Sequence, residues 1–374
     1  FKHKKPTPYD EAVSLIWYLE NVFYHSFGTI FDYIQQNIFD DKPVKNDIIN
    51  IGFWPGGDRD GNPFVTPEIT KQVAKRLKQT VLKNYYRDVR KLRRKLTFKD
   101  VEDKITSLEH RLYNAFVDAD SKSIIQLDEF VSELKDIKNI LNKEHQSLYE
   151  KDVISLINKT HLFGFHFANL DIRQDSRAHD KVFTAMVDRL IESGSAIFPK
   201  DYNTLPPEKQ VEVLSEVEGS VDLGLFEDEE VLKTLNTIKA IKEIQDNNGE
   251  SAANRYIISN NQTTLNVMQL YAMLKLVAFQ DKLTVDIGPL FETITDLENA
   301  HLVMEELYTN PAYKAHLKSR GNKQTIMLGF SDGTKDGGYL MANWAIFKAK
   351  ERLTKVSRKY DVTVIFFDGR GGPP

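Results

Sequence analysis

The feature that most constrains this chain is a pattern that recurs along it: a short apolar run, then charged residues, then a stretch with helical periodicity. Residues 326–330 show it most clearly. They are apolar and are followed by Asp332, Lys335 and Asp336 among several glycines, and a helix is expected at about 339–360. Such a density of charge makes a poor core, whereas glycines let backbone approach a ligand closely. The segment therefore predicts a strand that ends in a site for a metal ion and an anion.

Other apolar runs have the same form and are expected to be strands: residues 47–54, 163–170, 256–258, 283–291 and 362–367. In chain order, the expected strand ends carry Asp58 and Arg59, Arg173, Asn260 and Asn261, Glu292, Asp332 and Lys335, and Asp368 and Arg370. Alternation of strands and helices predicts a parallel sheet. In both open α/β sheets and closed barrels, functional residues lie at the carboxyl ends of the strands.

The rest of the sequence is mostly helical in pattern. Residues 8–37 repeat apolar side chains at helical spacing, and residues 66–159 contain only helical patterns. Residues 194–226 are polar and contain Pro199, Pro206 and Pro207, which indicates an insertion with a short helix. We therefore expect a predominantly helical α/β chain.

Composition excludes several classes of function. The net charge of −4 leaves no basic excess for nucleic acid, and the absence of cysteine excludes disulfides, thiolate catalysis and cysteine-bound metals. No run approaches the roughly 18 apolar residues of a membrane helix, and no signal-like segment is seen. We expect a cytoplasmic protein that binds neither nucleic acid nor membrane. Both ends of the chain look cut, so a fragment of a longer protein is expected.

The strand-end residues suggest a chemistry. A hard divalent cation takes oxygen ligands, often one or two carboxylates together with substrate phosphate and water. An arginine fork matches a phosphate or a carboxylate. The pattern therefore suggests a metal-assisted enzyme acting on a small phosphorylated anion. The competing interpretation is that each charged strand end is only a helix cap or a surface ion pair.

Several motifs together resemble the phosphoenolpyruvate carboxylase family. Residues 56–63 read GGDRDGNP, residues 170–174 read LDIRQ and residues 289–293 read PLFET, as in that family. Residues 330–336, FSDGTKD, are similar to its YSDSAKD segment, and residues 368–372, DGRGG, are similar to its HGRGG segment. The motifs occur in family order across essentially the whole chain.

The resemblance implies an incomplete (β/α)8 barrel of TIM type, with about six strands and long inserted helices. Residues 1–65 would hold a helix and the first of these strands, residues 66–160 an inserted helical bundle, and residues 161–374 the remaining strands with the catalytic residues. It also implies that an upstream histidine motif and a large C-terminal part lie outside this chain. The isolated fragment is then expected to be inactive.

The reaction implied by the resemblance is carboxylation of phosphoenolpyruvate by bicarbonate, which gives oxaloacetate and phosphate and feeds the tricarboxylic acid cycle. Glu292 and Asp332 would hold Mg2+ or Mn2+, Arg173 and Arg370 would bind the phosphate, and Lys335 would orient bicarbonate or phosphate. A last group, Asp58, Arg59 and Asp336, would form supporting ion pairs that fix the loops. The complete enzyme would be a homotetramer under allosteric control.

The chain departs from the family where Asp368 stands in place of the usual histidine, so the role of that histidine does not transfer. Two other functions stay open. One is a different metal-dependent barrel enzyme that acts on a phosphorylated or dicarboxylate substrate without bicarbonate. The other is a non-catalytic helical interaction module, in which the strand-end charges are structural ion pairs and no divalent ion binds.

Overall fold

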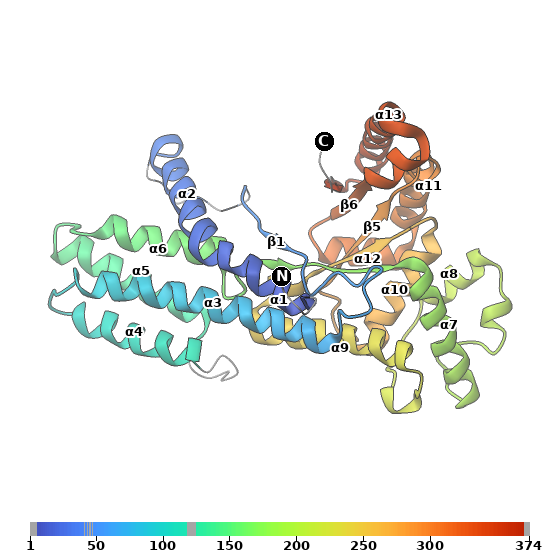
Figure 1. Ribbon diagram of the computed structural model, residues 1–374, viewed down its shortest axis with the longest axis horizontal. Helices are drawn as coiled ribbons and strands as arrows, with labels where there is room; N and C mark the ends of the chain where they lie inside the picture. The colour runs from blue at the N-terminus through green and yellow to red at the C-terminus, as the bar shows by residue number, and fades with distance from the viewer. Residues whose placement is uncertain are drawn as a thin grey trace. The chain divides into compact units, whose positions relative to one another are not determined.

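The computed structural model describes residues 6–40, 42, 44, 46, 48–117 and 125–369. They form two compact units. Figure 1 shows the chain with its helices and strands labelled. The first unit comprises Phe1–Gly56, Glu68–Leu170 and Glu243–Ala253, and the second comprises Gly57–Pro67, Asp171–Lys242 and Asn254–Pro374. The domain boundaries expected at residues 65 and 160 stay a prediction.

The first unit is almost entirely helical. Its elements are α1 (Pro8–Tyr18), the π-helical turn η1 (Leu19–Phe23), α2 (Tyr24–Ile38), β1 (Gly52–Phe53), α3 (Pro67–Arg93), α4 (Glu102–Val117), α5 (Leu127–Glu144), α6 (Glu150–Phe163), β2 (Asn169–Leu170) and η4 (Glu250–Ala253). The two short strands pair in parallel. On α5, one buried face of Phe130, Leu134, Ile137 and Leu141 repeats at helical spacing.

Aromatic side chains fill the centre of the first unit. Tyr24 is fully buried, and its ring stacks on Phe163 with 5.2 Å between the centroids. Its hydroxyl donates to Asp88 Oδ2 at 2.9 Å, and Lys159 Nζ lies 2.8 Å from the same oxygen. The carboxylate is therefore satisfied where it is partly buried.

The second unit alternates strands and helices. Its elements are β3 (Ile172–Asp175), α7 (Ser176–Glu192), η2 (Tyr202–Thr204), α8 (Pro207–Ser215), η3 (Leu223–Leu225), α9 (Glu229–Asn248, of which the last residues belong to the first unit), β4 (Arg255–Ser259), α10 (Thr264–Val277), β5 (Asp286–Phe291), α11 (Ile294–Thr309), α12 (Pro311–Ser319), β6 (Lys323–Gly329), α13 (Ser331–Lys359) and β7 (Thr363–Gly369).

The strands of the second unit form a five-stranded sheet in the order β3-β4-β5-β6-β7, and every neighbouring pair is parallel. The predicted parallel α/β architecture with a predominance of helix is therefore confirmed. The helices α11 and α13 pack against each other beside the sheet (Figure 1). No helix in the described ranges is both long enough and apolar enough to cross a membrane.

Local sequence starts helices immediately after strands. Asp175 caps α7 by accepting from the Arg177 N–H at 2.7 Å. Thr263 and Thr293 cap α10 and α11, each in a reciprocal capping box. A side-chain oxygen at the N-cap satisfies an N–H that has no partner within the helix. These short connections hold the strand-end residues at the carboxyl edge of the sheet.

The structure corrects three expected elements. Among the described residues of the strand predicted at 47–54, only Gly52–Phe53 form strand, as β1. The strand predicted at residues 163–170 is wrong for most of its length, because α6 continues to Phe163 and a turn follows with Phe167 at φ 67°. Phe163, Phe165 and Phe167 are all buried, so this segment follows the helical core and forms strand only at β2. Residues 331–337, expected to be a loop, begin α13, and the helix is interrupted at Gly338 with φ 78° and ψ 167°.

Candidate active site

The carboxyl edge of the five-stranded sheet gathers polar residues from several elements. Glu292 follows β5 directly, Asn260 follows β4, and Asp332 lies in the first turn of α13 after β6. Residues 57–67 run beside β3, where Asp58 and Arg173 form a parallel bridge. The expected meeting of strand ends therefore exists for these four elements.

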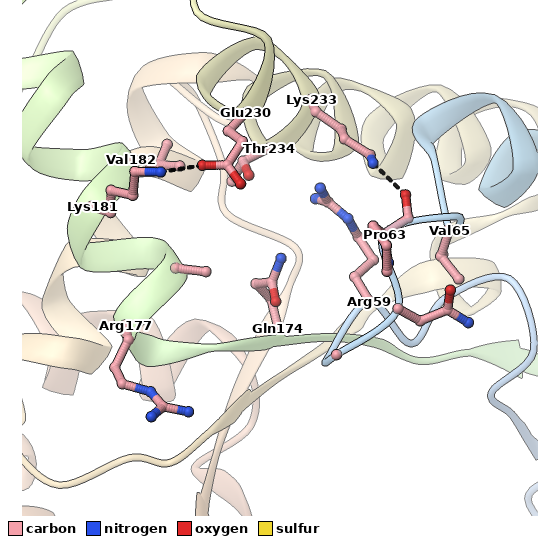
Figure 2. Close-up of a pocket in the computed structure, with 13 residues that line it drawn as sticks. Arg59, Pro63, Val65, Gln174, Arg177, Lys181, Val182, Glu230, Lys233 and Thr234 are labelled. Atoms are coloured by element: carbon pink, nitrogen blue, oxygen red, sulfur yellow. Dashed lines mark hydrogen bonds and ion pairs between the residues drawn. The ribbon is translucent and has the colours of Figure 1, made fainter.

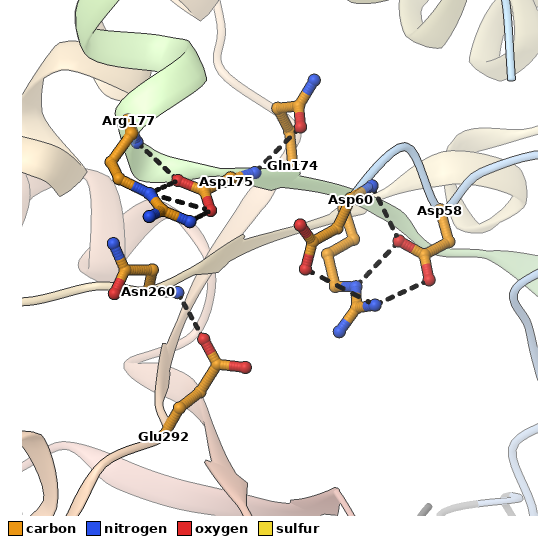
Figure 3. A network of polar contacts seen from close by, with 8 residues as sticks. Asp58, Asp60, Gln174, Asp175, Arg177, Asn260 and Glu292 are labelled. Carbon is orange, nitrogen blue, oxygen red and sulfur yellow. Dashed lines mark hydrogen bonds and ion pairs between the residues drawn. The ribbon is translucent and has the colours of Figure 1, made fainter. Parts of the chain in front are cut away.

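Successive side chains of β3 point to opposite sides of the strand. Gln174 lines a pocket between α7 and α9 (Figure 2). Arg173 joins a polar network with Asp58 and Asp60, and Figure 3 shows these two carboxylates from residues 57–67 close together. One strand thus contributes to two separate polar regions.

Arg173 is held by a two-pronged contact with Asp58. Its Nε donates to Oδ1 and its Nη2 donates to Oδ2, both at 2.8 Å, and Nη2 lies 3.6 Å from Asp60 Oδ2. Burial on its own lowers the pKa of Arg173, but the hydrogen bonds and charge of Asp58 outweigh burial and raise it. Asp58 therefore pairs with Arg173, and its role as a supporting residue stays a prediction.

Glu292 lies where negative charges accumulate. Its Oε2 accepts from the Asn260 backbone N–H at 2.6 Å, a contact visible in Figure 3. Burial raises the pKa of Glu292, and the nearby carboxylates of Asp332 and Asp60 raise it further. The backbone hydrogen bond and Arg173 act in the opposite direction without cancelling the effect. A positive charge bound here would relieve this repulsion.

The start of α13 carries the remaining predicted residues. Lys335 Nζ lies 2.8 Å from Asp332 Oδ1, and both side chains are largely exposed. Asp336 Oδ2 accepts from the Ile294 N–H at 3.1 Å, so it joins the start of α13 to the start of α11. Asp336 therefore supports the edge through a backbone hydrogen bond, where an ion pair was expected.

Arg59 also differs from the expected ion pair. Its side chain is only 7% exposed, and its Nη1 donates to Thr237 Oγ1 at 2.8 Å. Within the described part of the chain it contacts no carboxylate. Burial lowers the pKa of its guanidinium.

Two predicted positions lie at the end of the described chain. Asp368 is within β7, and Lys350 Nζ approaches its Oδ1 to 2.7 Å. Arg370, the second expected phosphate ligand, lies outside the described residues. The structure therefore does not test its role.

Sequence reasoning missed three charged residues at this edge: Asp60, Asp175 and Arg177. Arg177 donates to the carboxylate of Asp175 through Nε at 2.9 Å, next to Gln174 in Figure 3. The position of Asp175 between a strand and a helix was a usable signal for a cap. A further pair, Asp171 and Arg255 at 2.7 Å, has no such local signal because 84 residues separate the partners.

The donor set at this edge suits a hard divalent cation. The described residues contain no group of three or more His, Cys, Asp or Glu arranged to hold a metal. Glu292 and Asp332 offer two carboxylates that repel each other. Two protein carboxylates, with substrate and water as further ligands, are typical of Mg2+ sites. Glu292 and Asp332 could therefore supply part of the ligand set of the predicted divalent cation.

A parallel α/β sheet with acidic and basic groups at its carboxyl edge is typical of α/β enzymes whose functional residues lie at the ends of the strands. Comparison with known proteins identifies the family. The chain belongs to the phosphoenolpyruvate carboxylase family, because the family model described as "Phosphoenolpyruvate carboxylase" matches residues 1–122 and 107–373. The resemblance seen in the motifs is confirmed.

Curated relatives carry the same name. The chain is 30% identical to phosphoenolpyruvate carboxylase of Nitrosomonas eutropha over 92% of its own length and 42% of the relative. It is 28% identical to that of Rhodothermus marinus, over 99% of this chain and 45% of the relative, and 30% identical to that of Shewanella loihica, over 99% and 44%. The chain therefore spans less than half the length of the curated relatives it matches.

Proposed function

We propose that the protein containing this chain carboxylates phosphoenolpyruvate with bicarbonate to give oxaloacetate and phosphate. The proposal depends on one observation: Glu292, Asp332 and Arg173 lie close enough at one edge of the sheet for their charges to interact. The chain also matches the family along nearly all its length. Carboxylates and an arginine in reach of one another suit a phosphorylated substrate and a divalent cation.

The reaction proceeds in three balanced steps. A bicarbonate oxygen attacks phosphorus, and the bond between phosphorus and the enol oxygen breaks, which gives carboxyphosphate and the enolate of pyruvate. Carboxyphosphate then splits into CO2 and phosphate. The enolate carbon attacks CO2 and forms oxaloacetate. Phosphoryl transfer of this kind depends mainly on positioning and charge stabilisation.

The residues of this chain would supply that positioning. Arg173 and Arg370 bind the phosphoryl group, and Asp58 fixes the plane of the Arg173 guanidinium through its two hydrogen bonds. Lys335 orients bicarbonate or phosphate, and its Nζ also donates to Asp332 Oδ1 at 2.8 Å. The Asn260 N–H holds the carboxylate of Glu292 in one orientation.

Glu292 and Asp332 are the residues that would hold Mg2+ or Mn2+. When bound, the ion supplies positive charge to substrate oxygens and lowers the free energy of the enolate. The raised pKa of Glu292 supports this assignment, since a carboxylate that repels its neighbours gains most from a cation.

We further propose that the sheet is part of an incomplete TIM-type barrel. Its strands follow one another in sequence order and are all parallel, as in a singly wound barrel, whereas doubly wound sheets reverse their order. A barrel completed by other parts of the protein also explains why we expect this chain alone to be inactive. The whole enzyme is proposed to be a cytoplasmic homotetramer with an anaplerotic role.

The decisive experiment measures oxaloacetate formation by the full-length protein from phosphoenolpyruvate and Mg2+, with and without bicarbonate. We expect oxaloacetate only with bicarbonate, in amounts equal to the phosphate released. Turnover that does not depend on bicarbonate would contradict the proposal and favour another metal-dependent barrel enzyme. A preparation of residues 1–374 alone should form no oxaloacetate.

A further inference from the structure

A second polar region of the second unit lies apart from the pair Glu292 and Asp332. It is a pocket of about 480 Å3 formed by residues 57–67, β3, α7 and α9. Figure 2 shows Lys181 and Arg177 projecting from one side, Lys233 from another, and Arg59 among them. This volume lies within the range of pockets that hold small molecules.

Positive charge dominates the lining of this pocket. Its charged members are the cations Arg59, Arg177, Lys181 and Lys233 and the carboxylate of Glu230. Glu230 is paired with Lys181, and Arg177 is paired with Asp175. Lys233 donates to the carbonyl oxygen of Pro63, which is neutral. Two cations, Lys233 and Arg59, therefore have only neutral acceptors among their contacts in the described structure.

Of these two cations, Arg59 gives the stronger indication that the pocket binds a ligand. Arg59 as a residue is 7% exposed, and its guanidinium, hydrogen-bonded to a threonine hydroxyl, carries a charge that no described carboxylate neutralises. Burial of an unpaired charge is unfavourable, and its pKa is lowered accordingly. An anion seated in the pocket would supply the missing partner. Surface lysines alone would not support this argument, but a buried arginine does.

The pocket adjoins the catalytic edge across β3, and Arg177 lines the pocket while lying within electrostatic reach of Glu292. Gln174 faces the pocket, whereas the neighbouring Arg173 faces Asp58 and Asp60. The two regions are nevertheless coupled through the backbone, since the Arg59 N–H donates to the Arg173 carbonyl oxygen at 2.9 Å. A ligand on Arg59 would therefore hold the segment that carries Asp58.

We propose that this pocket binds a small phosphate-bearing anion through Arg59 and Lys233. A phosphate dianion matches an excess of several positive charges better than a monoanion does, and the N–H groups of an arginine fork donate to two of its oxygens. The ligand would join residues 57–67 to α9 and strengthen the support of Arg173. This site goes beyond the proposed carboxylation and does not depend on it.

The first test is titration of the full-length protein with inorganic phosphate by calorimetry at constant ionic strength. Lys233→Gln removes one cation at a half-buried position and should weaken phosphate binding at this site at least tenfold. Glu230→Gln removes the carboxylate that competes with the ligand and should tighten binding. Opposite signs for these two variants are expected if the anion sits in this pocket.

Lys239→Gln is the matched control. Lys239 lies on the same helix, α9, but does not line the pocket, so its loss removes the same charge from the protein without touching the site. Phosphate affinity equal to that of the parent protein is expected. If Lys233→Gln and Lys239→Gln have equal effects, binding is only non-specific attraction and the proposal is wrong.

A second measurement locates the anion without relying on affinity. Crystals soaked in tungstate, a phosphate analogue with strong anomalous scattering, should show the anion beside the Arg59 guanidinium and Lys233 Nζ. Anomalous density confined to the Arg173 region would overturn the proposal. Malonate tests the chemical class, and tighter binding of this dicarboxylate than of phosphate at the pocket would overturn the assignment to a phosphate. None of these readouts uses carboxylation, so a failure here is distinguishable from a failure of the proposed function.

Discussion

Arg173 and Asp58 face each other with two hydrogen bonds of 2.8 Å, although 115 residues separate them in the chain. The contact joins residues 57–67 to β3 and fixes the guanidinium plane at the carboxyl edge of the sheet. Both side chains keep some exposure, 20% and 26%, so solvent screens the pair in part. Its main effect is expected on the orientation of Arg173.

Asp58→Asn tests that orientation. The amide keeps one acceptor but loses the charge and one prong of the fork, so the protein should lose about 1–2 kcal/mol of stability. The KM for phosphoenolpyruvate should rise because Arg173 is no longer held in one plane. Denaturant unfolding and steady-state kinetics of the full-length protein measure the two effects. Asp60→Asn is the control, since its carboxylate lies 3.6 Å from the same arginine and should matter much less.

Replacement of Arg173 by lysine tests phosphate binding. Lysine retains the charge but cannot form the two-pronged contact, so kcat/KM should fall on the order of 100-fold. Arg320→Lys is the matched control, because Arg320 forms a comparable contact with Asp286 at the amino end of β5, at 2.6 Å. That variant should keep its kcat/KM. Equal losses of kcat/KM in both variants would show that Arg173 does not bind the substrate.

Metal binding can be measured apart from activity. Glu292→Gln and Asp332→Asn each remove one carboxylate ligand, and each should weaken Mn2+ binding, followed by the paramagnetic signal of the free ion, at least tenfold. Asp336→Asn is the control, because Asp336 accepts a backbone N–H and its amide can still do so. If Mn2+ affinity survives both Glu292→Gln and Asp332→Asn, the metal assignment is wrong.

Glu292 should also make stability depend on pH. Its pKa is raised in the folded protein, so the folded state binds the proton more tightly than the unfolded state does. Stability contributed by this group is therefore present below the unfolded pKa and is lost as pH rises through the folded pKa. Glu292→Gln removes the ionisable group, so at neutral pH the variant should have a higher Tm than the parent protein. Thermal unfolding of both proteins from pH 4 to 8 measures this difference in Tm. A Tm difference that does not change with pH would contradict the prediction.

Gly56 should not tolerate a side chain. It has φ +86°, and an added Cβ would lie 2.6 Å from Val73 Cγ2. Gly56→Ala is therefore expected to lose about 2–4 kcal/mol, from a left-handed backbone and a steric clash together. Gly194→Ala separates the two causes, because Gly194 has φ +79° and nothing within 4 Å of the added Cβ. If the two variants unfold at the same denaturant concentration, the clash with Val73 is absent.

The sequence predicted most of the second unit because its signals are local. Apolar runs at β4, β5 and β6 gave buried strands, and caps such as Thr293 began helices immediately after them. Glu292 was found because it directly follows a strand. The errors at residues 163–170 and 331–337 have different causes. The apolar residues 163–170 are compatible with helix or strand, and packing against distant aromatic neighbours decides between them. At residues 331–337 the glycines indicated a loop, whereas the structure continues them as the first turns of α13.

The sequence by itself determined the family, the parallel alternation of strands and helices, and the positions of Glu292 and Asp332 at strand ends. These features depend on spacing along the chain and on motifs read in order. Only the tertiary structure decided the partner of each charge. It paired Arg173 with Asp58, left Arg59 with a threonine, and brought Lys181 and Lys233 around one pocket. Such partners come from segments far apart in sequence, and their distances exist only once the chain has folded.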